Sequence, residues 1–588
     1  MRFLVLLLLV SLALVGLHLV LLYGFLPYAA LGPALDAANA AAQLAADPFP
    51  PRHLAHAAGA YAQLRAGAFA AAAAGLLGLL GLLGLGGGHR ALAHEGRRLG
   101  RDVRRAGRAL GQRLRRQPPA AWAGAGVLLL AVVAVRLYFL LHNPFDADEQ
   151  VSADYFAAPG AAVTAGFYLL PNNHVLYNLL AGAALRLAPA GHPETLLRAP
   201  ALGLGLLGLV GSFAGLAHLA DRRVAAWVTL VFQLAPMAVE YATVARGYGP
   251  QSVCVQAAAL ATAVLLRGPA GHRLAWAVWV PSCLAGFYFI PTFGYAFGGL
   301  GAVLLLAGGP GRQARRWQAL LAGAGVAALA ALLYLPVGWL SGWALLLANP
   351  YVRPLALGTV LARLPHHWQV VAGGLYGSSA LALPVLGVLA LAPVAVRAWG
   401  HPAWRPWAWV AWAGAVAPWP LLLAQRVLPP ARTLHYSAWL VGAVAALALA
   451  SVARRWPARA PALWAVAFAL GGAYAGARLV LRFRVLARTQ HDERAWRQAA
   501  DWLAARPPRP VLTTVPGFEV YLAHRAWVQG QPRPRVRYRA AGPEAFGGEF
   551  LVLQTRPQAL AAPPASARCR AVFCNELLCI YAPGTLPY

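Results

Sequence analysis

The sequence contains no lysine, so all of its basic charge comes from arginine. Acidic residues are scarce as well: 18 of them against 49 basic residues give a formal net charge of +31 over 588 residues. An excess of alanine, glycine, proline and arginine is typical of a GC-rich genome, so the positive charge is no evidence for nucleic-acid binding. We expect no nucleic acid among the partners.

Cysteine is also rare, with five residues. Cys254 and Cys283 lie in apolar runs, whereas Cys569, Cys574 and Cys579 lie near the C-terminus. Disulfides persist in oxidising compartments, so the last three could form one disulfide if that end of the chain is extracytoplasmic. Free buried thiols are an equally good interpretation.

Apolar residues make up 60% of the chain, and the mean hydropathy is +0.57. The apolar runs repeatedly reach the roughly 20 residues that a helix needs to cross a bilayer, which predicts an α-helical polytopic membrane protein. The first run, Phe3–Phe25, is longer than the roughly 7 to 15 apolar residues in the core of a cleavable signal. We therefore expect it to be an uncleaved span.

Arginines cluster in the short loops between apolar runs, as expected for loops held on the cytoplasmic side. The arginine-dense stretch 89–116 should remain in the cytoplasm. The next run, Trp122–Leu141, must then cross outward, and this fixes the orientation of the later spans. The later basic loops all fall inside if the partly polar segment 167–189 lies on the membrane as interfacial helices. These loops are 221–223, 267–273, 311–317, 397–407 and 453–459. The pattern predicts about thirteen spans and an extracytoplasmic C-terminus.

Composition divides the chain into three parts. Residues 1–120 form an N-terminal extension with two spans and a basic cytoplasmic segment, and residues 121–482 form the transmembrane core. Residues 483–588 are more polar and predict a small extracytoplasmic α/β domain. In this tail HDERAWRQAADWLAARP has helical spacing, and PVLTTV, EFLVLQ and CIYA have the composition of short strands.

An acidic cluster follows the third apolar run: Asp146, Asp148, Glu149 and Asp154 lie within nine positions. Carboxylates at a membrane surface are costly unless they are paired, hydrated or bound to a cation, so we interpret this loop as a functional site. One carboxylate could act as a general base on a hydroxyl, the Asp146-x-Asp148 pair could hold Mg²⁺ or Mn²⁺, or one could orient the substrate. Asp154 fits the N-cap of a following helix about as well as a functional role.

Two further groups of polar residues lie on the predicted outer face. The segment PNNHVLYN offers Asn172, Asn173, His174 and Asn178 as hydrogen-bonding partners for a phosphate or sugar. The segment MAVEYATVARGYGP brings Glu240, Arg246 and Tyr248, and LPPARTLHYSAW brings Arg432. Outer arginines are not explained by the positive-inside bias, whereas a phosphate partner would explain them. Contact with lipid headgroups is the alternative.

Together these segments resemble the GT-C superfamily of membrane glycosyltransferases, close to the bacterial branch of the aminoarabinose transferase and the protein O-mannosyltransferases. The resemblance is most specific from Trp122 to about Leu265, through DADEQ, PNNH and VEYATVARGY, and continues in PPARTLHY. It implies a GT-C fold in the bacterial inner membrane, with the active site and the C-terminus extracytoplasmic. It also implies inverting transfer of a sugar from a polyprenyl-phosphate donor to a lipid, glycan or protein acceptor. Membrane lipids are further expected partners.

The resemblance assigns the catalytic acid to Asp148, with Glu149 beside it. Relatives often carry a lysine where this chain has Asn173 and His174, so donor phosphate contacts would come from His174, Arg246 and Arg432, with Asn173, Tyr248 and Glu240 nearby. Relatives differ in their need for a metal. Asp146 and Asp148 could hold a divalent cation if the reaction needs one, and the same pair would serve a site without a metal.

The main alternative is a polytopic transporter or flippase of lipids or glycolipids. Such a protein is expected to place its polar groups near the midplane and to carry internal repeats, and neither feature is evident in the sequence. A membrane scaffold leaves the acidic cluster unexplained. An oligosaccharide polymerase or ligase is a closer alternative among enzymes.

Overall fold

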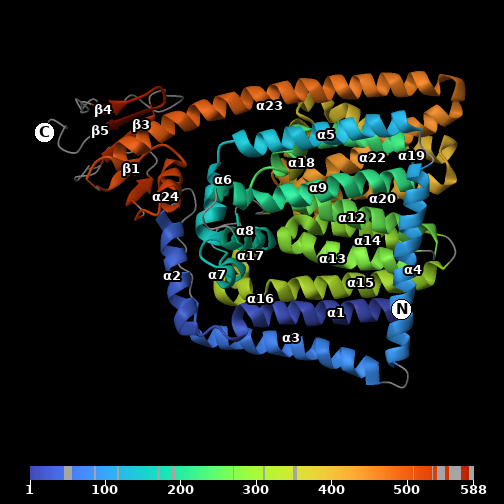
Figure 1. Ribbon diagram of the computed structural model, residues 1–588, viewed down its shortest axis with the longest axis horizontal. Helices are drawn as coiled ribbons and strands as arrows, with labels where there is room; N and C mark the ends of the chain where they lie inside the picture. Colours follow the sequence, from blue (N-terminus) through green and yellow to red (C-terminus); the bar gives the residue numbers. More distant parts are fainter. Residues whose placement is uncertain are drawn as a thin grey trace.

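Long apolar helices run side by side through most of the molecule (Figure 1). The computed structural model describes residues 1–44, 56–84, 88–115, 118–168, 172–187, 192–268, 271–308, 311–347, 354–507, 509–532, 534–538, 550–554 and 571–581. Over these ranges, ten helical segments are long and apolar enough to cross a membrane. They contain α1 (Arg2–Leu19), α3 (Ala58–Gly84), α5 (Pro119–His142), α9 (Pro193–Leu219), α12 (Tyr248–Arg267), α15 (Arg312–Leu333), α19 (Ala382–Trp399), α20 (Arg405–Val416) with α21 (Pro418–Gln425), α22 (His435–Arg455) and α23 (Ala460–Ala504).

The predicted polytopic helical architecture is therefore confirmed. Helices α10 (Arg222–Gln233), α13 (His272–Phe289) and α14 (Gly294–Leu306) pack among the ten but are shorter or less apolar. The total of thirteen spans stays a prediction.

The arginine-rich loops meet at one end of the bundle, where α4 (Gly88–Arg115) runs across the ends of the other helices (Figure 1). Arg273 of α13 forms an ion pair with Glu95 of α4. Arg267 donates hydrogen bonds to the carbonyl oxygens of Leu219 and Ala403, which joins three loops. We call this end, made of α4 and the described residues 220–223, 267–268, 271–273 and 400–404, the basic end.

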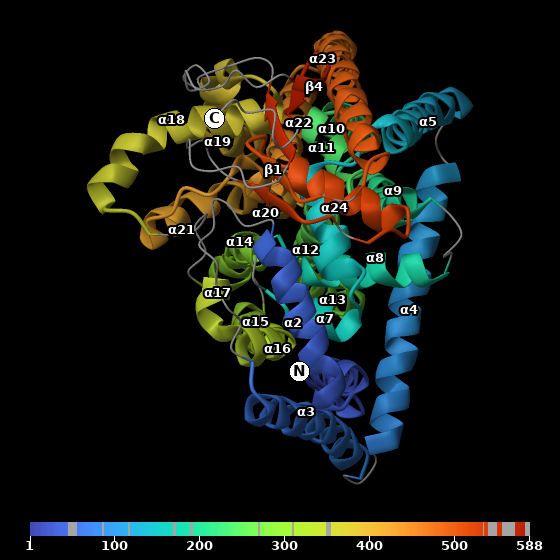
Figure 2. The same cartoon turned by 90° about the vertical axis from the view of Figure 1, so that its left-hand side faces the viewer.

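Short helices cover the opposite end, which we call the loop end. They are α2 (Tyr28–Leu44), α6 (Ala147–Val151), η2 (Ser152–Ala157), α7 (Ala161–Gly166), α8 (Val175–Leu187), α16 (Leu335–Val337), η4 (Gly338–Gly342) and α17 (Trp343–Leu347). Figure 2 looks onto this end, and α2 and α8 extend across the view, so they lie across the bundle axis. Helix α8 is apolar, but its 13 residues are too few to cross a bilayer, as predicted for an interfacial helix.

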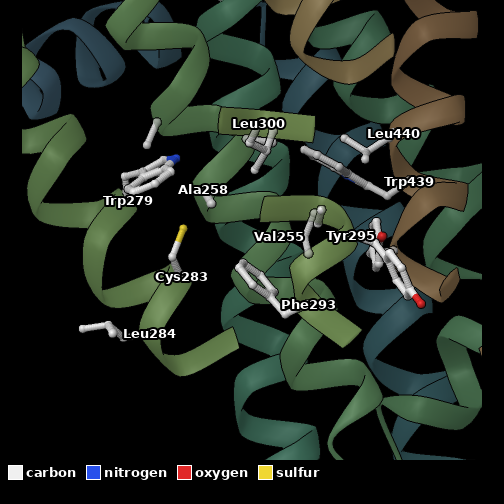
Figure 3. Close-up of a cluster of buried hydrophobic side chains, with 14 of the residues drawn as sticks. Val255, Ala258, Trp279, Cys283, Leu284, Phe293, Tyr295, Leu300, Trp439 and Leu440 are labelled. Atoms are coloured by element: carbon white, nitrogen blue, oxygen red, sulfur yellow. The ribbon is translucent and has the colours of Figure 1, made fainter. Parts of the chain in front are cut away.

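Aromatic and aliphatic side chains from α12, α13, α14 and α22 fill the middle of the bundle (Figure 3). Trp279 and Trp439 are buried, and each indole N–H has a partner: Trp279 donates to Thr262 at 3.1 Å and Trp439 to Ser212 at 2.8 Å. Both indoles are therefore buried with their N–H groups satisfied, and they pack in the core between these helices.

The C-terminal part is a small α/β domain, as predicted. Helix α23 passes without a break through the expected boundary at 482–483 and leads from the bundle into this domain (Figure 1). The sheet has the order β2-β1-β3-β5-β4, with β1 (Val511–Thr513) parallel to β2 (Val536–Tyr538) and β3 (Phe550–Gln554). Strand β5 (Leu578–Tyr581) pairs antiparallel with β3 and with β4 (Ala571–Cys574). Helix α24 (Phe518–Val528) packs on the sheet and also contacts α6.

One disulfide joins the last two strands, between Cys574 and Cys579. Cys569, the third terminal cysteine, lies outside the described residues. Cys254 and Cys283 are free thiols within α12 and α13. The structure therefore favours the disulfide interpretation over free thiols for this pair.

Candidate active site

The acidic loop is organised by a reciprocal cap at the start of α6. The Asp146 carboxylate accepts a hydrogen bond from the Glu149 N–H at 2.8 Å, and the Glu149 carboxylate accepts one from the Asp146 N–H at 3.2 Å. These bonds satisfy N–H groups that the first turn of a helix leaves without partners. The interpretation of Asp154 as an N-cap is wrong, because Asp154 lies inside the helical segment η2 and Asp146 is the cap.

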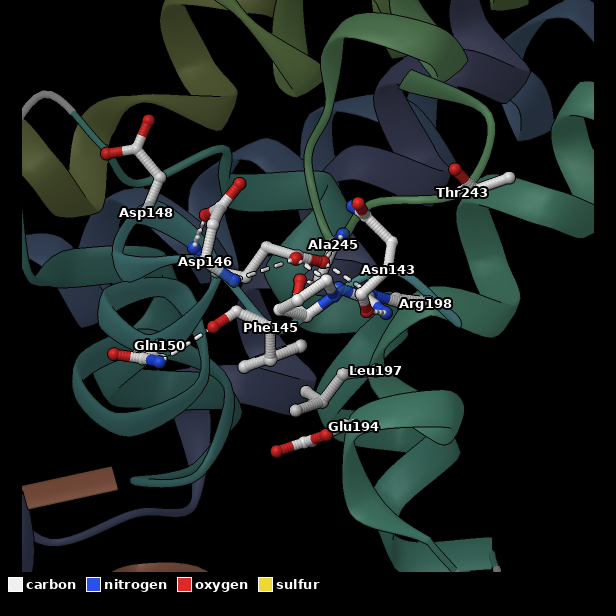
Figure 4. Close-up of polar contacts among 12 residues, drawn as sticks. Asn143, Phe145, Asp146, Asp148, Gln150, Glu194, Leu197, Arg198, Thr243 and Ala245 are labelled. Carbon is white, nitrogen blue, oxygen red and sulfur yellow. Dashed lines mark hydrogen bonds and ion pairs between the residues drawn. The ribbon is translucent and has the colours of Figure 1, made fainter. Parts of the chain in front are cut away.

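Glu149 is fully buried in an ion pair with Arg198 of α9. Arg198 and Ala245 are labelled in Figure 4. The Arg198 Nε and Nη2 atoms lie 2.7 and 2.5 Å from the two carboxylate oxygens, and the Ala245 N–H donates to the same carboxylate at 2.5 Å. Arg198 also donates to the carbonyl oxygens of Asn143 and Pro144, each at 2.8 Å. Glu149 therefore ties α6 to α9 and to the turn before α12, which is a positioning role.

Asp148 differs from the fully buried Glu149 because its side chain is 52% exposed. Its carboxylate lies 3.4 Å from Nη2 of Arg246. Its backbone carbonyl accepts hydrogen bonds from Asn172 Nδ2 at 2.9 Å and from Arg246 Nη1 at 3.2 Å. Asp148 thus presents an accessible carboxylate, and its backbone carbonyl is held by Asn172 and Arg246.

Arg246 is buried, with 3% of its surface exposed. Its guanidinium donates to the Asn172 side-chain oxygen and lies 3.5 Å from the Ser152 hydroxyl. A buried guanidinium is costly unless several groups pair with it, and Asp148 supplies the carboxylate here. Gly249 makes the adjacent turn possible, because a Cβ atom there would lie 2.0 Å from the Tyr241 carbonyl oxygen.

Tyr248 brings Arg432 to the same place. Arg432, in η8 (Ala431–Leu434), donates from Nε to the Tyr248 hydroxyl at 3.1 Å. The guanidinium carbons of Arg246 and Arg432 lie 5.7 and 6.0 Å from the centroid of the Tyr248 ring. The fold therefore places the guanidinium groups of Arg246 and Arg432 against the Tyr248 side chain, and the Asp148 carboxylate beside Arg246.

His174 and Asn173 hold the loop beneath this group. The His174 Nδ1 atom accepts a hydrogen bond from the Gly247 N–H at 2.8 Å, so Nε2 carries the proton of the neutral ring. Burial lowers the pKa of His174 well below 6.5, and Arg246 and Arg432 lower it further. Asn173 donates both amide hydrogens, to the carbonyl oxygens of Thr164 and Phe167. Asn173 thus has no donor left for a phosphate.

Asn178 and Glu240 also contact protein groups. Asn178 Nδ2 donates to the Asn173 side-chain oxygen at 2.9 Å. The Glu240 carboxylate lies 3.3 Å from Nη1 of Arg482, so it joins α11 (Pro236–Tyr241) to the long helix α23. Their predicted contacts with a donor sugar stay predictions.

The Asp146-x-Asp148 pair supplies two carboxylates for a cation. Asp146 caps α6 with one oxygen, and Asp148 faces Arg246. In the part of the chain that the structure describes, no group of three or more His, Cys, Asp or Glu residues could hold a metal ion. Mg²⁺ commonly binds through one or two carboxylates, water and substrate phosphate oxygens, so the pair fits that mode, and metal use stays a prediction.

The small domain reaches the site through His524 of α24. Its Nδ1 atom lies 3.0 Å from the Asp154 carboxylate and its Nε2 atom 3.5 Å from that of Glu194. The ring also stacks on Phe145, with centroids 4.9 Å apart. Nothing in the tail sequence identified His524 as a contact to the acidic loop.

The docking of α24 should weaken as the pH rises. Burial alone would lower the pKa of His524, but hydrogen bonds to Asp154 and Glu194 raise it from 6.5 to about 9. The protonated ring therefore stabilises docking fully below pH 6.5, and this contribution, about 3 kcal/mol, is lost as the pH rises through 9. Hydrogen exchange of α24, corrected for intrinsic rates, should be faster at pH 9.5 than at pH 6.5. In His524→Gln this difference should vanish; an unchanged difference would contradict the assignment.

No protein-family model and no curated protein matches the sequence. The structure is similar to that of ArnT from Cupriavidus metallidurans in the apo state, with a TM-score of 0.52 and 16% identity over 79% of this chain and 98% of that chain. It is also similar to ArnT from the same organism bound to undecaprenyl phosphate, with a TM-score of 0.51 and 15% identity over 80% of this chain and 100% of that chain. At these identities the likeness establishes the fold.

Proposed function

The chain has the fold of the GT-C membrane glycosyltransferases, and from this fold and the site we propose that it is a glycosyltransferase. It moves a sugar from a polyprenyl-phosphate donor to an acceptor hydroxyl and inverts the anomeric configuration. The observation that carries the proposal is the exposed Asp148 carboxylate beside Arg246. Arg246 lies over the Tyr248 ring, and Arg432 donates a hydrogen bond to the Tyr248 hydroxyl.

These residues can divide the chemistry of transfer between them. Asp148 takes the proton of the acceptor hydroxyl, and the oxygen attacks the anomeric carbon from the face opposite the phosphate. The bond from that carbon to the phosphate oxygen breaks, and the lipid phosphate leaves with the electron pair. Arg246 and Arg432 stabilise the departing anion by charge-assisted hydrogen bonds, so no general acid is needed.

The donor class and the location follow from charge. Two guanidinium groups at the loop end suit a phosphate at headgroup depth, and the ArnT structure with undecaprenyl phosphate supports a lipid-phosphate ligand for this fold. Because positive loops stay in the cytoplasm, the basic end is cytoplasmic and the loop end is extracytoplasmic, in a bacterial inner membrane. A transporter is not favoured, since the charged groups of the site gather at one end of the bundle.

Mass spectrometry of surface glycans and lipids tests the proposal. Cells that produce the protein should carry one sugar modification that is absent without it, and the Asp148→Asn variant should restore the unmodified state. If the glycans and lipids are identical with and without the protein, the chain is not a transferase in those cells.

Arg432→Ala should weaken use of the donor more than use of the acceptor. Loss of one charge-assisted contact to a phosphate should raise the apparent KM for the polyprenyl-phosphate donor by about 10- to 100-fold and change that for the acceptor little. The matched control is Arg426→Ala, since Arg426 is exposed, lies shortly before Arg432 and contributes its backbone carbonyl to a hydrogen bond with Leu355. Equal loss for donor and acceptor would point to a structural role for Arg432.

A further inference from the structure

A polar cavity of about 580 Å³ lies between the bundle and the small domain. Its walls come from the loop between α5 and α6, from the last turns of α23 and from α24. Asp148, Arg246, Tyr248 and Arg432 do not line it, so it is separate from the proposed donor site. Gln150 of α6 does line the cavity, whereas Asp148 of the same helix belongs to the proposed donor site. Helix α6 therefore separates the cavity from the donor site.

The cavity carries more positive than negative charge. Arg494, Arg497 and Arg525 line it together with the carboxylates of Glu194 and Glu493. Arg497 is paired with Glu493 at 2.5 Å, and Arg525 forms an ion pair with Asp501, which lies outside the lining. Within the described ranges, no carboxylate lies at ion-pair distance from Arg494. An anion entering the cavity would therefore meet an arginine that is not already neutralised.

Gln150 offers the complementary kind of contact. It is 3% exposed, and its Nε2 atom donates to the Phe145 carbonyl oxygen at 2.7 Å, which fixes the orientation of the amide. Its Oε1 atom is buried and has no hydrogen-bond partner among the described residues. A buried acceptor of this kind favours a ligand with a hydroxyl group to donate.

We propose that this cavity binds an anionic sugar, which would be the part of the acceptor that the enzyme recognises. Arg494, supported by Arg497 and Arg525, pairs with the phosphate or carboxylate of that sugar, and Gln150 Oε1 and Glu194 accept its hydroxyl hydrogens. The side chains of Gln150 and Asp148 leave the same short helix in different directions (Figure 4). An acceptor anchored in the cavity is therefore separated from the base by α6 and reaches around this helix. The acceptor role rests on the proposed function, whereas the binding itself does not.

Binding can be measured without donor on the full-length protein in phosphatidylcholine nanodiscs. Glucose 1-phosphate is the probe, with glucose and inorganic phosphate as comparisons, and isothermal titration gives the affinities. We expect saturable binding of glucose 1-phosphate that is tighter than that of either comparison. Arg494→Ala should weaken it at least about tenfold, as the loss of a charge-assisted hydrogen bond implies, and Gln150→Leu should weaken it without abolishing it. Arg488→Ala, an exposed arginine of α23 that does not line the cavity, is the matched control.

Equal binding in the wild type and in Arg494→Ala would overturn the proposal, and so would inorganic phosphate that binds as tightly as the sugar phosphate. A nanodisc arm with a phosphorylated glycolipid in the membrane distinguishes a lipid-borne sugar from a soluble one: competition with glucose 1-phosphate supports the lipid-borne form, and absence of competition supports the soluble form. If transfer is never observed but Arg494-dependent binding is, the proposed function fails while the binding site stands.

Discussion

Asp148→Asn should reduce sugar transfer by about 10²- to 10⁴-fold, the usual contribution of a general base, while the protein stays folded and inserted. The amide has nearly the shape of the carboxylate but cannot take a proton from the acceptor hydroxyl. Folding should survive because the side chain is 52% exposed and the local hydrogen bonds go to the backbone carbonyl of Asp148. Transfer from a purified polyprenyl-phosphate sugar, at saturating donor, measures the effect.

The matched control for this variant is Asp492→Asn, which removes a carboxylate from α23 on the same side of the bundle. It should transfer at the wild-type rate. Size-exclusion profiles of both variants should match the wild type. Normal transfer by Asp148→Asn would remove Asp148 from the role of base.

Glu149→Ala should cause the largest loss of stability among single substitutions at the site. It would leave Arg198, which is 3% exposed, as an uncompensated buried charge, and breaking such a pair costs about 3–5 kcal/mol. The Ala245 N–H and the Asp146 N–H would also lose their acceptor. Thermal melting followed by fluorescence-detected size exclusion should show a strongly lowered midpoint and little folded protein.

Two further variants separate this explanation from general fragility of the loop. Glu149→Leu combined with Arg198→Met removes both charges and should melt above Glu149→Leu alone. Glu240→Ala breaks a partly exposed pair with Arg482, so it should cost about 0–1 kcal/mol. A double variant as unstable as the single one would show that the buried charge is not the cause.

The residues of the site could be predicted where their charge conflicted with the membrane. The sequence singles out Arg246 and Arg432 because they lie on the predicted outer face, where the positive-inside bias gives no reason for arginine. The same reasoning applies to Arg198, at the outer start of α9, and it would have identified that residue too. Charge on the unexpected side of a span is thus an informative signal in this sequence.

The division of labour among the acids could not be predicted. Asp146, Asp148 and Glu149 are equivalent by local sequence, and their roles are decided by partners far along the chain, Arg198 and Arg246. The cap is a partial exception, because Asp146 followed three residues later by Glu149 is a sequence signature of a capping box, and it is a better signal than Asp154.

The contact between the small domain and the site had no sequence signal either. The strand segments PVLTTV, EFLVLQ and CIYA correspond to β1, β3 and β5, because strand composition is a local property. The pairing of His524 with Asp154 depends on how α24 docks on the acidic loop, which no local pattern encodes. For the same reason the polar cavity between the two parts appears only in three dimensions.

A cryo-EM map of the protein in nanodiscs with polyprenyl phosphate tests the central claim most directly. The account predicts that the phosphate lies at the loop end, within hydrogen-bond distance of Arg246 and Arg432 and beside the Tyr248 ring, with the Asp148 carboxylate open toward it. A phosphate bound at the basic end, or at the loop end without either arginine, would contradict the account.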